Sequence, residues 1–323
     1  MIIVTGAAGF IGSCMAHHLI AEGQSPVVCV DDFSREDKAA NLPMDTNCLR
    51  VDRQNLFDWW EEHRGKISWV IHLGARTDTA ELSETIFNQL NLHYSQQIWT
   101  LCARDQLPLI YASSAATYGG GEHGFSDAHE GLAALQPLNP YGWSKHRMDL
   151  WALQQATPPP FWAGLKFFNV FGPNEFHKGR MASVIFHAYH QITRSGGLKL
   201  FRSHRADYQD GMQMRDFIYV KDLVAVMRFL MEGKTASGLY NLGTGQARTF
   251  LDLGRAVFSA LEVPANIAFV DTPIDIRDTY QYFTEAQMVK LRTAGWGASF
   301  TPLEAAIDDY VKKYLVPGKY FQA

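Results

Sequence analysis

Residues 1–12, "MIIVTGAAGFIG", decide the fold that the sequence predicts. A short apolar run leads directly into a turn that carries Gly6, Gly9 and Gly12, and a helical pattern follows the turn. Glycines let the backbone turn tightly and approach a pyrophosphate, which then lies on the free N–H groups at the start of the helix. A tight turn between a strand and a helix also uses glycines for steric reasons alone. The strand before the turn and the helix after it favour dinucleotide binding.

Outward from this turn, short apolar runs alternate with helical patterns. The first helix carries Ile11, Met15, Leu19 and Ile20 on one face and ends at Gly23. Further buried strands are predicted for four apolar runs, "PVVCVDD", "SWVIHLGA", "LPLIYASSA" and "WAGLKFFNV". Helical stretches precede the last three, and "TPPP" ends one of these because proline cannot continue a helix. This alternation predicts a Rossmann-type, doubly wound α/β fold with a parallel sheet between helices.

The alternation stops near residue 170, beyond which loops and scattered helices predominate. We predict a dinucleotide-binding domain over residues 1–168 and a smaller α/β substrate-binding lobe over residues 169–213 and 241–323. Residues 214–240, which begin "MRDFIYVKDLVAVMRFLM", are predicted to return to the first domain as a strand and a helix.

The composition is that of an ordinary globular protein. Of the 323 residues, 47% are apolar and 19% are charged, and the formal net charge is −4. Because basic residues do not cluster, neither nucleic acid nor a membrane surface is expected as a partner. No apolar stretch is long enough to span a membrane and no leader pattern appears at "MIIVT", so we expect a cytoplasmic protein. The 4 cysteines lack CxxC spacing and are expected to be reduced, and no histidine has metal-ligand spacing.

Cofactor selectivity depends on the residues that follow the second strand. Asp31 ends that strand about 20 residues after the turn, where a carboxylate binds the 2′-hydroxyl of an adenosine ribose and favours NAD. Arg35, Lys38 and Arg53 lie close in sequence and would neutralise the 2′-phosphate of NADP. The spacing alone leaves the choice between the two cofactors open.

A second pattern combines "YASSAATYG" (111–119) with "YGWSK" (141–145). Tyr141 and Lys145 are four residues apart and share one helix face. An ammonium beside a phenol is expected to lower the phenol pKa from its usual value of about 10, which makes the phenol an acid/base for a sugar or alcohol hydroxyl. Ser114, at the carboxyl end of a predicted strand, would hydrogen-bond the same hydroxyl.

Together with further motifs, these residues resemble the extended short-chain dehydrogenase/reductase superfamily from residue 1 to about residue 314. The further motifs are "HLGA" (72–75), Asn91, "FFNVFGP" (167–173), "RDFIYVKD" (215–222) and "NLGTG" (241–245). Members of this superfamily mostly act on nucleotide-activated sugars. Within it, "FHKGRMASVIFH" (176–187), "NLGTGQARTF" (241–250) and "YQYFT" (280–284) are similar to the nucleotide-sugar epimerases that act on an ADP-linked heptose.

The resemblance implies an isomerase that holds NADP. In such an enzyme C6″ of the ADP-heptose is oxidised to a ketone, the ketone reorients, and hydride returns to its opposite face without net redox change. A proton donor is then needed at two positions, and the resemblance implies that Tyr141 serves one and Lys178 the other. For Lys178, the alternative is a simple contact with a substrate phosphate.

Two other functions stay open at this point. A related enzyme on another nucleotide sugar, such as a 4-epimerase or a dehydratase, keeps Ser114, Tyr141 and Lys145 but has no need of Lys178. A nucleotide sensor without catalysis does not need the combination of Ser114, Tyr141 and Lys145. A homo-oligomer is expected, and the sequence leaves its number of subunits open.

The resemblance also implies binding residues, and the sequence pattern itself predicts one further helix. The predicted cofactor contacts are Gly6, Gly9, Phe10, Ile11, Gly12, Asp31, Asp32, Lys38, Arg53, Leu73, Gly74, Ala75, Asn91, Lys145, Val170 and Lys178. The predicted substrate contacts are Ser114, Asn169, Arg180, Ser183, His187, Phe201, Arg202, Ser203, His204, Arg215 and Tyr280. A helix is predicted to begin near Gly179, with its free N–H groups toward the diphosphate and with Ser183 and His187 on one face. Residues 203–214 and the pair Arg76 and Thr77 depart from the family pattern and predict local differences in the diphosphate loop and the cofactor contacts.

Overall fold

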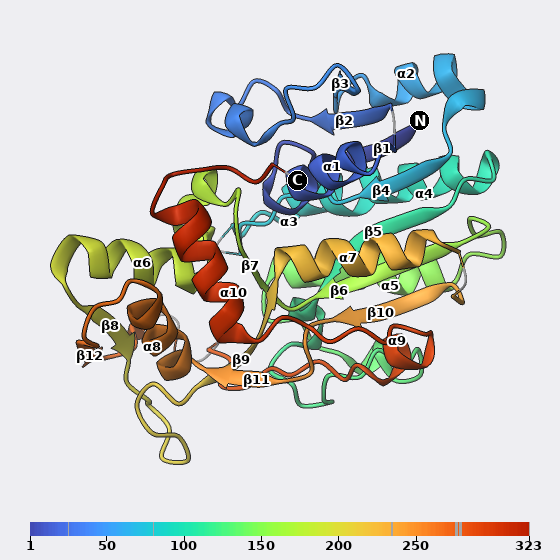
Figure 1. Ribbon diagram of the computed structural model, residues 1–323. Helices are drawn as coiled ribbons and strands as arrows, with labels where there is room; N and C mark the ends of the chain where they lie inside the picture. Colours follow the sequence, from blue (N-terminus) through green and yellow to red (C-terminus); the bar gives the residue numbers. More distant parts are fainter. Residues whose placement is uncertain (25, 80, 234, 275–276, 278–279, 323) are drawn as a thin grey trace.

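The computed structural model describes residues 1–24, 26–79, 81–233, 235–274, 277 and 280–322 (Figure 1). Its main sheet has seven parallel strands in the order β10-β6-β5-β4-β1-β2-β3. The strands are β1 (Ile2–Thr5), β2 (Val27–Asp31), β3 (Cys48–Asp52), β4 (Trp69–His72), β5 (Leu109–Ser114), β6 (Trp162–Phe167) and β10 (Gly238–Leu242). The strand order reverses beside β1, and in such sheets a dinucleotide binds at the carboxyl ends of the strands at that point. The predicted Rossmann-type fold is confirmed.

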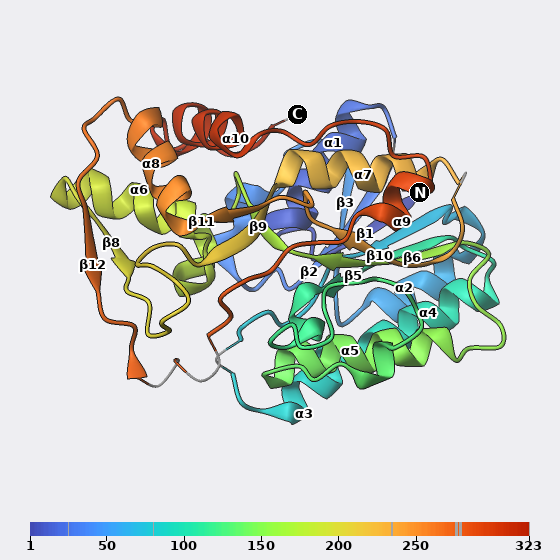
Figure 2. The ribbon, with the colours of Figure 1, turned by 90° about the horizontal axis from the view of Figure 1, so that it is seen from below.

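Helices cover both faces of this sheet, as Figure 2 shows. The helices α1 (Phe10–Ala21) and α7 (Val220–Met231) lie on one face, and α2 (Leu56–His63), α4 (Tyr94–Arg104) and α5 (Pro140–Leu153) lie on the other. Every residue of β1, β2 and β10 is buried, because helices cover both faces of the sheet, and most of these residues are apolar. The apolar runs predicted as buried strands are β1, β2, β4, β5 and β6.

The smaller lobe lies at the carboxyl ends of the main strands (Figure 1). Its strand β8 (Leu198–Phe201) pairs in parallel with β12 (Ile267–Val270). A second small sheet places β9 (Met214–Tyr219) between β7 (Asn169–Phe171) and β11 (Ala247–Thr249). The helices α6 (Val184–Ser195), α8 (Phe250–Ala260) and α10 (Leu303–Tyr310) pack against one another and against these strands.

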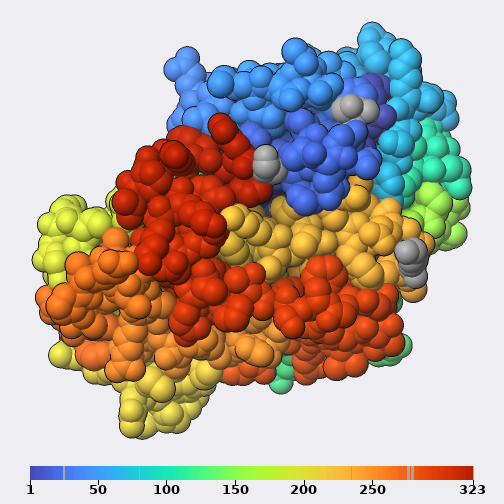
Figure 3. Space-filling view, viewed as in Figure 1, coloured from blue at the N-terminus to red at the C-terminus, as the bar shows by residue number. Residues whose placement is uncertain are grey.

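Shorter helices and turns complete the described chain. They are α3 (Glu84–Phe87), α9 (Val289–Thr293), the 3₁₀ turns Glu36–Asn41, Arg64–Lys66, Ala115–Tyr118, Leu132–Ala134 and Phe176–Met181, and the π turns Asn88–His93 and Val311–Leu315. The C-terminal segment lies between the N-terminal domain and the lobe (Figure 3, red), where the backbone N–H of Phe321 donates to Asn174 at 2.8 Å. Among the described helices, none has the length and apolar character that crossing a membrane would need.

The predicted return of residues 214–240 to the main domain is wrong for its strand. The helix α7 packs on α1 in the main domain, but β9 pairs with β7 and β11 in the lobe. The strand that returns to the main sheet is β10, which pairs with β6 and crosses the predicted boundary at residue 240. An apolar run encodes a buried strand locally, whereas its partner is decided by contacts far away in sequence.

Candidate active site

The glycine turn leaves space where side chains would clash with the backbone. Gly6 has a φ of +69°, and a Cβ at Gly12 would lie 2.1 Å from the Gly6 carbonyl oxygen. Gly9 caps α1, and no described side chain occupies the N–H groups at the start of that helix. A pyrophosphate can therefore approach the backbone closely, so the turn fits a dinucleotide cofactor.

Two carboxylates form ion pairs with two cations where β2 ends. Asp31 is buried, and its carboxylate accepts the backbone N–H of Ala8 at 2.9 Å and the ammonium of Lys38 at 3.0 Å. Asp32 accepts the guanidinium of Arg53 at 3.1 Å, and its pKa is lowered, first by the Ser34 hydroxyl. The structure thus brings Asp31, Asp32, Lys38 and Arg53 together as predicted.

The segment after β4 closes the other side of the predicted cofactor site. The backbone N–H of Gly74 donates to the Thr5 hydroxyl at 3.0 Å, which brings Leu73, Gly74 and Ala75 against the glycine turn. Asn91 is buried and holds the backbone of Arg76 from both sides, at 2.8 and 2.9 Å. Asn91 therefore positions this segment through hydrogen bonds of its own.

Ser114, Tyr141 and Lys145 come together at the carboxyl end of β5. Asn139 caps α5 by accepting the backbone N–H of Gly142 at 2.8 Å, which places Tyr141 in the first turn. The Tyr141 hydroxyl lies near the Ser114 side chain, and Ser114 lowers the pKa of Tyr141. One turn further along α5, the Lys145 ammonium donates to the Ala112 carbonyl at 2.8 Å. The structure thus brings together the three residues that the spacing predicted.

The predicted effect of Lys145 on Tyr141 is wrong. Burial raises the pKa of Tyr141, and the nearby Ser114 side chain opposes this only in part. Burial also lowers the pKa of Lys145 to about 8, with Asp149 acting in the opposite direction. Because both groups are desolvated, Tyr141 stays a protonated donor at neutral pH, whereas Lys145, with a pKa of about 8, still carries its positive charge there.

Lys178 lies against the cofactor turn. Its ammonium stands 5.2 Å from the centre of the Phe10 ring, and Phe10 is the first residue of α1. Burial lowers the pKa of Lys178, and the Glu175 carboxylate raises it. Within the described part of the chain, the Lys178 ammonium has no hydrogen-bond acceptor. A half-buried amine with a lowered pKa beside a cofactor site has the properties of an acid/base.

The turn that carries Lys178 is tied to the segment after β4. Arg180 pairs with both carboxylate oxygens of Asp78, at 2.8 and 3.0 Å. The Thr79 hydroxyl contacts the Met181 sulfur at 3.9 Å. These contacts join the segment after β4 to the turn that carries Lys178.

An aromatic and cationic cluster lies in the lobe at the predicted nucleotide end. The rings of Phe201 and Tyr280 are 6.2 Å apart, and the guanidinium of Arg215 is 5.6 Å from the Tyr280 ring. Arg215 is buried, and burial lowers its pKa. A His204–Tyr280 ring contact of 6.2 Å extends the cluster. A planar base and an anionic phosphate would both find partners here.

Residues 2–243 match the model of the NAD dependent epimerase/dehydratase family. The chain belongs to this family. An ADP-L-glycero-D-manno-heptose-6-epimerase from Fusobacterium nucleatum is 43% identical over 98% of both chains. An enzyme of the same name from Nitratidesulfovibrio vulgaris is 46% identical over 99% of this chain and all of the relative. The predicted resemblance to nucleotide-sugar epimerases is confirmed.

Solved structures of this epimerase/dehydratase family share the fold. The ADP-L-glycero-D-manno-heptose-6-epimerase of Helicobacter pylori superposes with a TM-score of 0.82 and is 26% identical, covering 97% of this chain and 95% of its own. A UDP-N-acetylglucosamine 4-epimerase from Methanobrevibacter ruminantium also gives a TM-score of 0.82 at 24% identity over 98% of both chains. Fold similarity alone therefore does not select among nucleotide sugars.

The helix that the sequence pattern predicted near Gly179 begins later. Gly179 has a φ of +52° inside a 3₁₀ turn, and α6 begins at Val184 with Ser183 as its N-cap. Ser183 donates its hydroxyl to the buried Glu175 carboxylate at 2.6 Å and accepts the backbone N–H of Phe186 at 3.2 Å. The hydroxyl of Ser183 is thus already engaged in capping, which the sequence spacing did not reveal.

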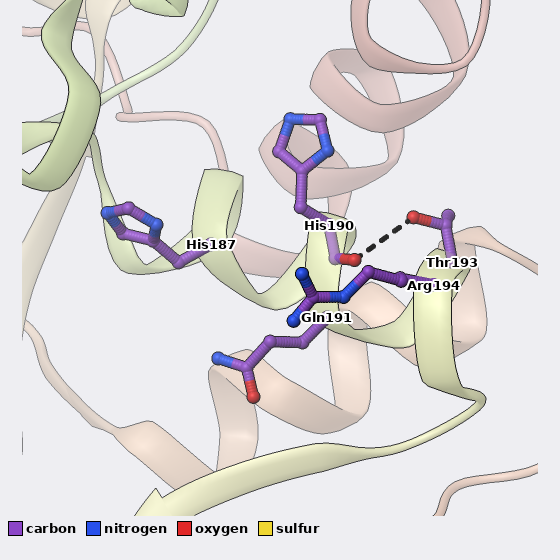
Figure 4. A pocket seen from close by; sticks show the side chains of 5 residues that line it. All are labelled: His187, His190, Gln191, Thr193 and Arg194. Atoms are coloured by element: carbon purple, nitrogen blue, oxygen red, sulfur yellow. Dashed lines mark hydrogen bonds between the residues drawn. The ribbon is translucent and has the colours of Figure 1, made fainter.

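The other predicted substrate contacts are more exposed. Figure 4 shows His187 on α6, along with four other residues that line an open hollow of about 550 Å³. This hollow is formed by α6 alone and contains neither Tyr141 nor Lys178, so it does not mark the reacting centre. Arg202 pairs with Asp271 at 3.3 Å on the surface. Asn169 is exposed on β7, where the main domain passes into the lobe.

Sequence reasoning missed Tyr282 and Gln281. The Tyr282 hydroxyl accepts the backbone N–H of His204 at 2.9 Å, and its ring is 5.5 Å from that of Tyr280. Gln281 donates its amide to the Gly119 carbonyl, linking the lobe to the turn after Ser114. The alternation in "YQYFT" was a signal that Tyr280 and Tyr282 share a side.

Proposed function

We propose that this epimerase inverts C6″ of ADP-D-glycero-D-manno-heptose to give ADP-L-glycero-D-manno-heptose. The observation that carries the chemistry is the position of Lys178, a half-buried amine on a different element from Tyr141 and against the first residue of α1. The choice of ADP-heptose is supported by full-length relatives that bear that enzyme's name at 43% and 46% identity.

The cofactor would be held by the residues predicted for it. Its pyrophosphate would lie on Gly6, Gly9, Phe10, Ile11 and Gly12, with Val170 and the segment from Leu73 to Ala75 toward the nicotinamide. When bound, the nicotinamide would supply the acceptor and the donor of the hydride that leaves C6″ and returns to its opposite face. The chain gains and loses no electrons, so one bound cofactor serves repeated turnovers.

The side chains of the chain move the protons. Ser114 binds the oxygen on C6″ and orients it toward Tyr141. In one orientation of the sugar, Tyr141 exchanges a proton with this oxygen, which is consistent with the raised pKa of a protonated phenol. After the ketone reorients in the site, Lys178 exchanges a proton with the same oxygen from the opposite side. Arg215 and Tyr280 would bind the ADP portion, which stays fixed while the sugar reorients.

We expect the purified protein to release NADP in preference to NAD when it is denatured. Lys38 and Arg53 supply two cations where β2 ends, and these would pair with a 2′-phosphate after leaving Asp31 and Asp32. Mass spectrometry of the released nucleotide decides the question. Arg53→Ala should lower the share of NADP, whereas Arg50→Ala, an exposed position on β3, should not. Release of NAD alone contradicts the NADP assignment.

A panel of nucleotide sugars tests the proposed function. The protein is expected to invert ADP-D-glycero-D-manno-heptose and to leave UDP-glucose and UDP-N-acetylglucosamine unchanged. Inversion of a UDP-sugar at C4, or loss of water from a sugar, would instead assign the protein to another branch of the family. Cofactor binding without turnover of any sugar would assign a sensor.

A further inference from the structure

A buried ion pair lies directly behind Lys145. Asp149 on α5 and Lys166 on β6 are both fully inaccessible, and the Lys166 ammonium is 2.6 Å from the Asp149 carboxylate. Burying two charges costs free energy that a single ion pair repays poorly, so such a pair is weak evidence for stability. Its location points to a role in the reacting centre.

The carboxylate of Asp149 continues the line of Tyr141 and Lys145 along α5. These three residues are spaced by four, so they lie on one helix face. They meet three consecutive residues at the end of β5: Ser114 with Tyr141, the Ala112 carbonyl with Lys145, and the Ser113 hydroxyl with Asp149 at 2.7 Å. Asp149 is therefore fixed in the same contact between strand and helix that places the two proposed catalytic residues.

Lys166 is tied to the same centre. Besides Asp149, its ammonium donates to the Thr117 hydroxyl at 2.8 Å, and that hydroxyl donates to the Ser114 carbonyl at 2.8 Å. The Tyr111 hydroxyl completes the shell of the Asp149 carboxylate at 3.0 Å. The described partners of this pair thus lead back to Ser114, and Asp149 itself lies one helical turn from Lys145 on α5.

The charges that face Lys145 are few. Tyr141 and Tyr111 are neutral because burial raises the pKa of each phenol, and burial lowers the pKa of His72 on β4 to about 3. His146 on α5 is also neutral, since burial lowers its pKa. Beyond Lys166 lie Asp127, whose pKa burial raises, and His129, whose pKa burial lowers. Among the described groups, Asp149 supplies the negative charge that opposes the effect of burial on the pKa of Lys145.

We propose that Asp149 and Lys166 are positioning residues for the reaction. Asp149 keeps Lys145 charged behind Tyr141, and Lys166 fixes the carboxylate and limits its effect. This inference rests on the proposed function, because it concerns the same centre.

The test is the pH profile of kcat for the holoenzyme with saturating ADP-heptose. Lys145 acts as an ammonium, so activity is lost as the pH rises through its pKa. Asp149→Asn removes the negative charge and should move this alkaline limb down by about one pH unit. Lys166→Met removes the positive charge that offsets the Asp149 carboxylate, so it should move the alkaline limb to higher pH. The double variant, which has neither charge, should move it down by less than Asp149→Asn alone.

Ser113→Ala is the matched control, because it removes a hydrogen bond to Asp149 and leaves both charges in place. It should lower the melting temperature and leave the limb where it is. The inference is overturned if the alkaline limb stays in place in Asp149→Asn and Lys166→Met. It is also overturned if the limb moves in the same direction in both variants. If the single variants do not fold, the double variant decides: a downward shift supports the inference and an unmoved limb overturns it. An inactive parent would refute the proposed function itself, and this inference with it.

Discussion

Tyr141→Phe is expected to lower the turnover of ADP-heptose by about 10²–10⁴-fold, the usual contribution of a general acid or base. The variant loses only the hydroxyl that lies near Ser114, so the cofactor should still copurify. The measurement is kcat at saturating substrate together with the amount of bound nucleotide.

Tyr240→Phe is the control for Tyr141→Phe. It removes another buried hydroxyl, one that donates to the Ala236 carbonyl at the far end of the main sheet. Turnover in this control should stay close to that of the parent. Near-normal turnover in Tyr141→Phe would end the assignment of Tyr141.

Lys178→Met is expected to abolish epimerisation as completely as Tyr141→Phe does. Without Lys178, one of the two orientations of the sugar has no group that exchanges a proton with the oxygen on C6″, so hydride transfer fails in that orientation. Either single variant should keep a partial reaction that needs one orientation only, such as dismutation of an aldehyde analogue of the sugar. The comparison of kcat for the two reactions therefore separates loss of one acid/base from loss of the whole site.

Lys178→Arg distinguishes the two roles open to this lysine. Arginine keeps the positive charge but does not release a proton at working pH. If Lys178 is an acid/base, Lys178→Arg should be as inactive as Lys178→Met. If Lys178 only contacts a phosphate, Lys178→Arg should restore activity, and Lys178→Met should raise KM while kcat survives.

The parts of the fold that the sequence predicted are those with a local cause. The glycines of the first turn are required by backbone contacts within a few residues, such as Gly12 against Gly6. Strands buried on both faces are continuous apolar runs, so β1, β2, β4, β5 and β6 could be recognised. The placement of β9 in the lobe and of β10 in the main sheet could not, because both depend on distant pairing partners.

The candidate site shows the same division. The fourfold spacing of Tyr141 and Lys145 placed both on α5, yet the pKa of Tyr141 rises because burial is a property of the whole fold. The start of α6 at Val184 depends on Glu175, which holds Ser183 from outside the helix. Lys166 lies on β6, and nothing in its local sequence indicated that it pairs with Asp149 on α5.

The most direct test uses ADP-D-glycero-D-manno-heptose that carries deuterium at C6″. Incubated with the purified protein in ordinary water, it should give the C6″ epimer with the deuterium retained, as proton NMR of the product would show. Retention is expected because the hydrogen that leaves C6″ is the one that returns. Inversion with loss of deuterium to the solvent, or a heptose that stays uninverted, would contradict transient oxidation at C6″.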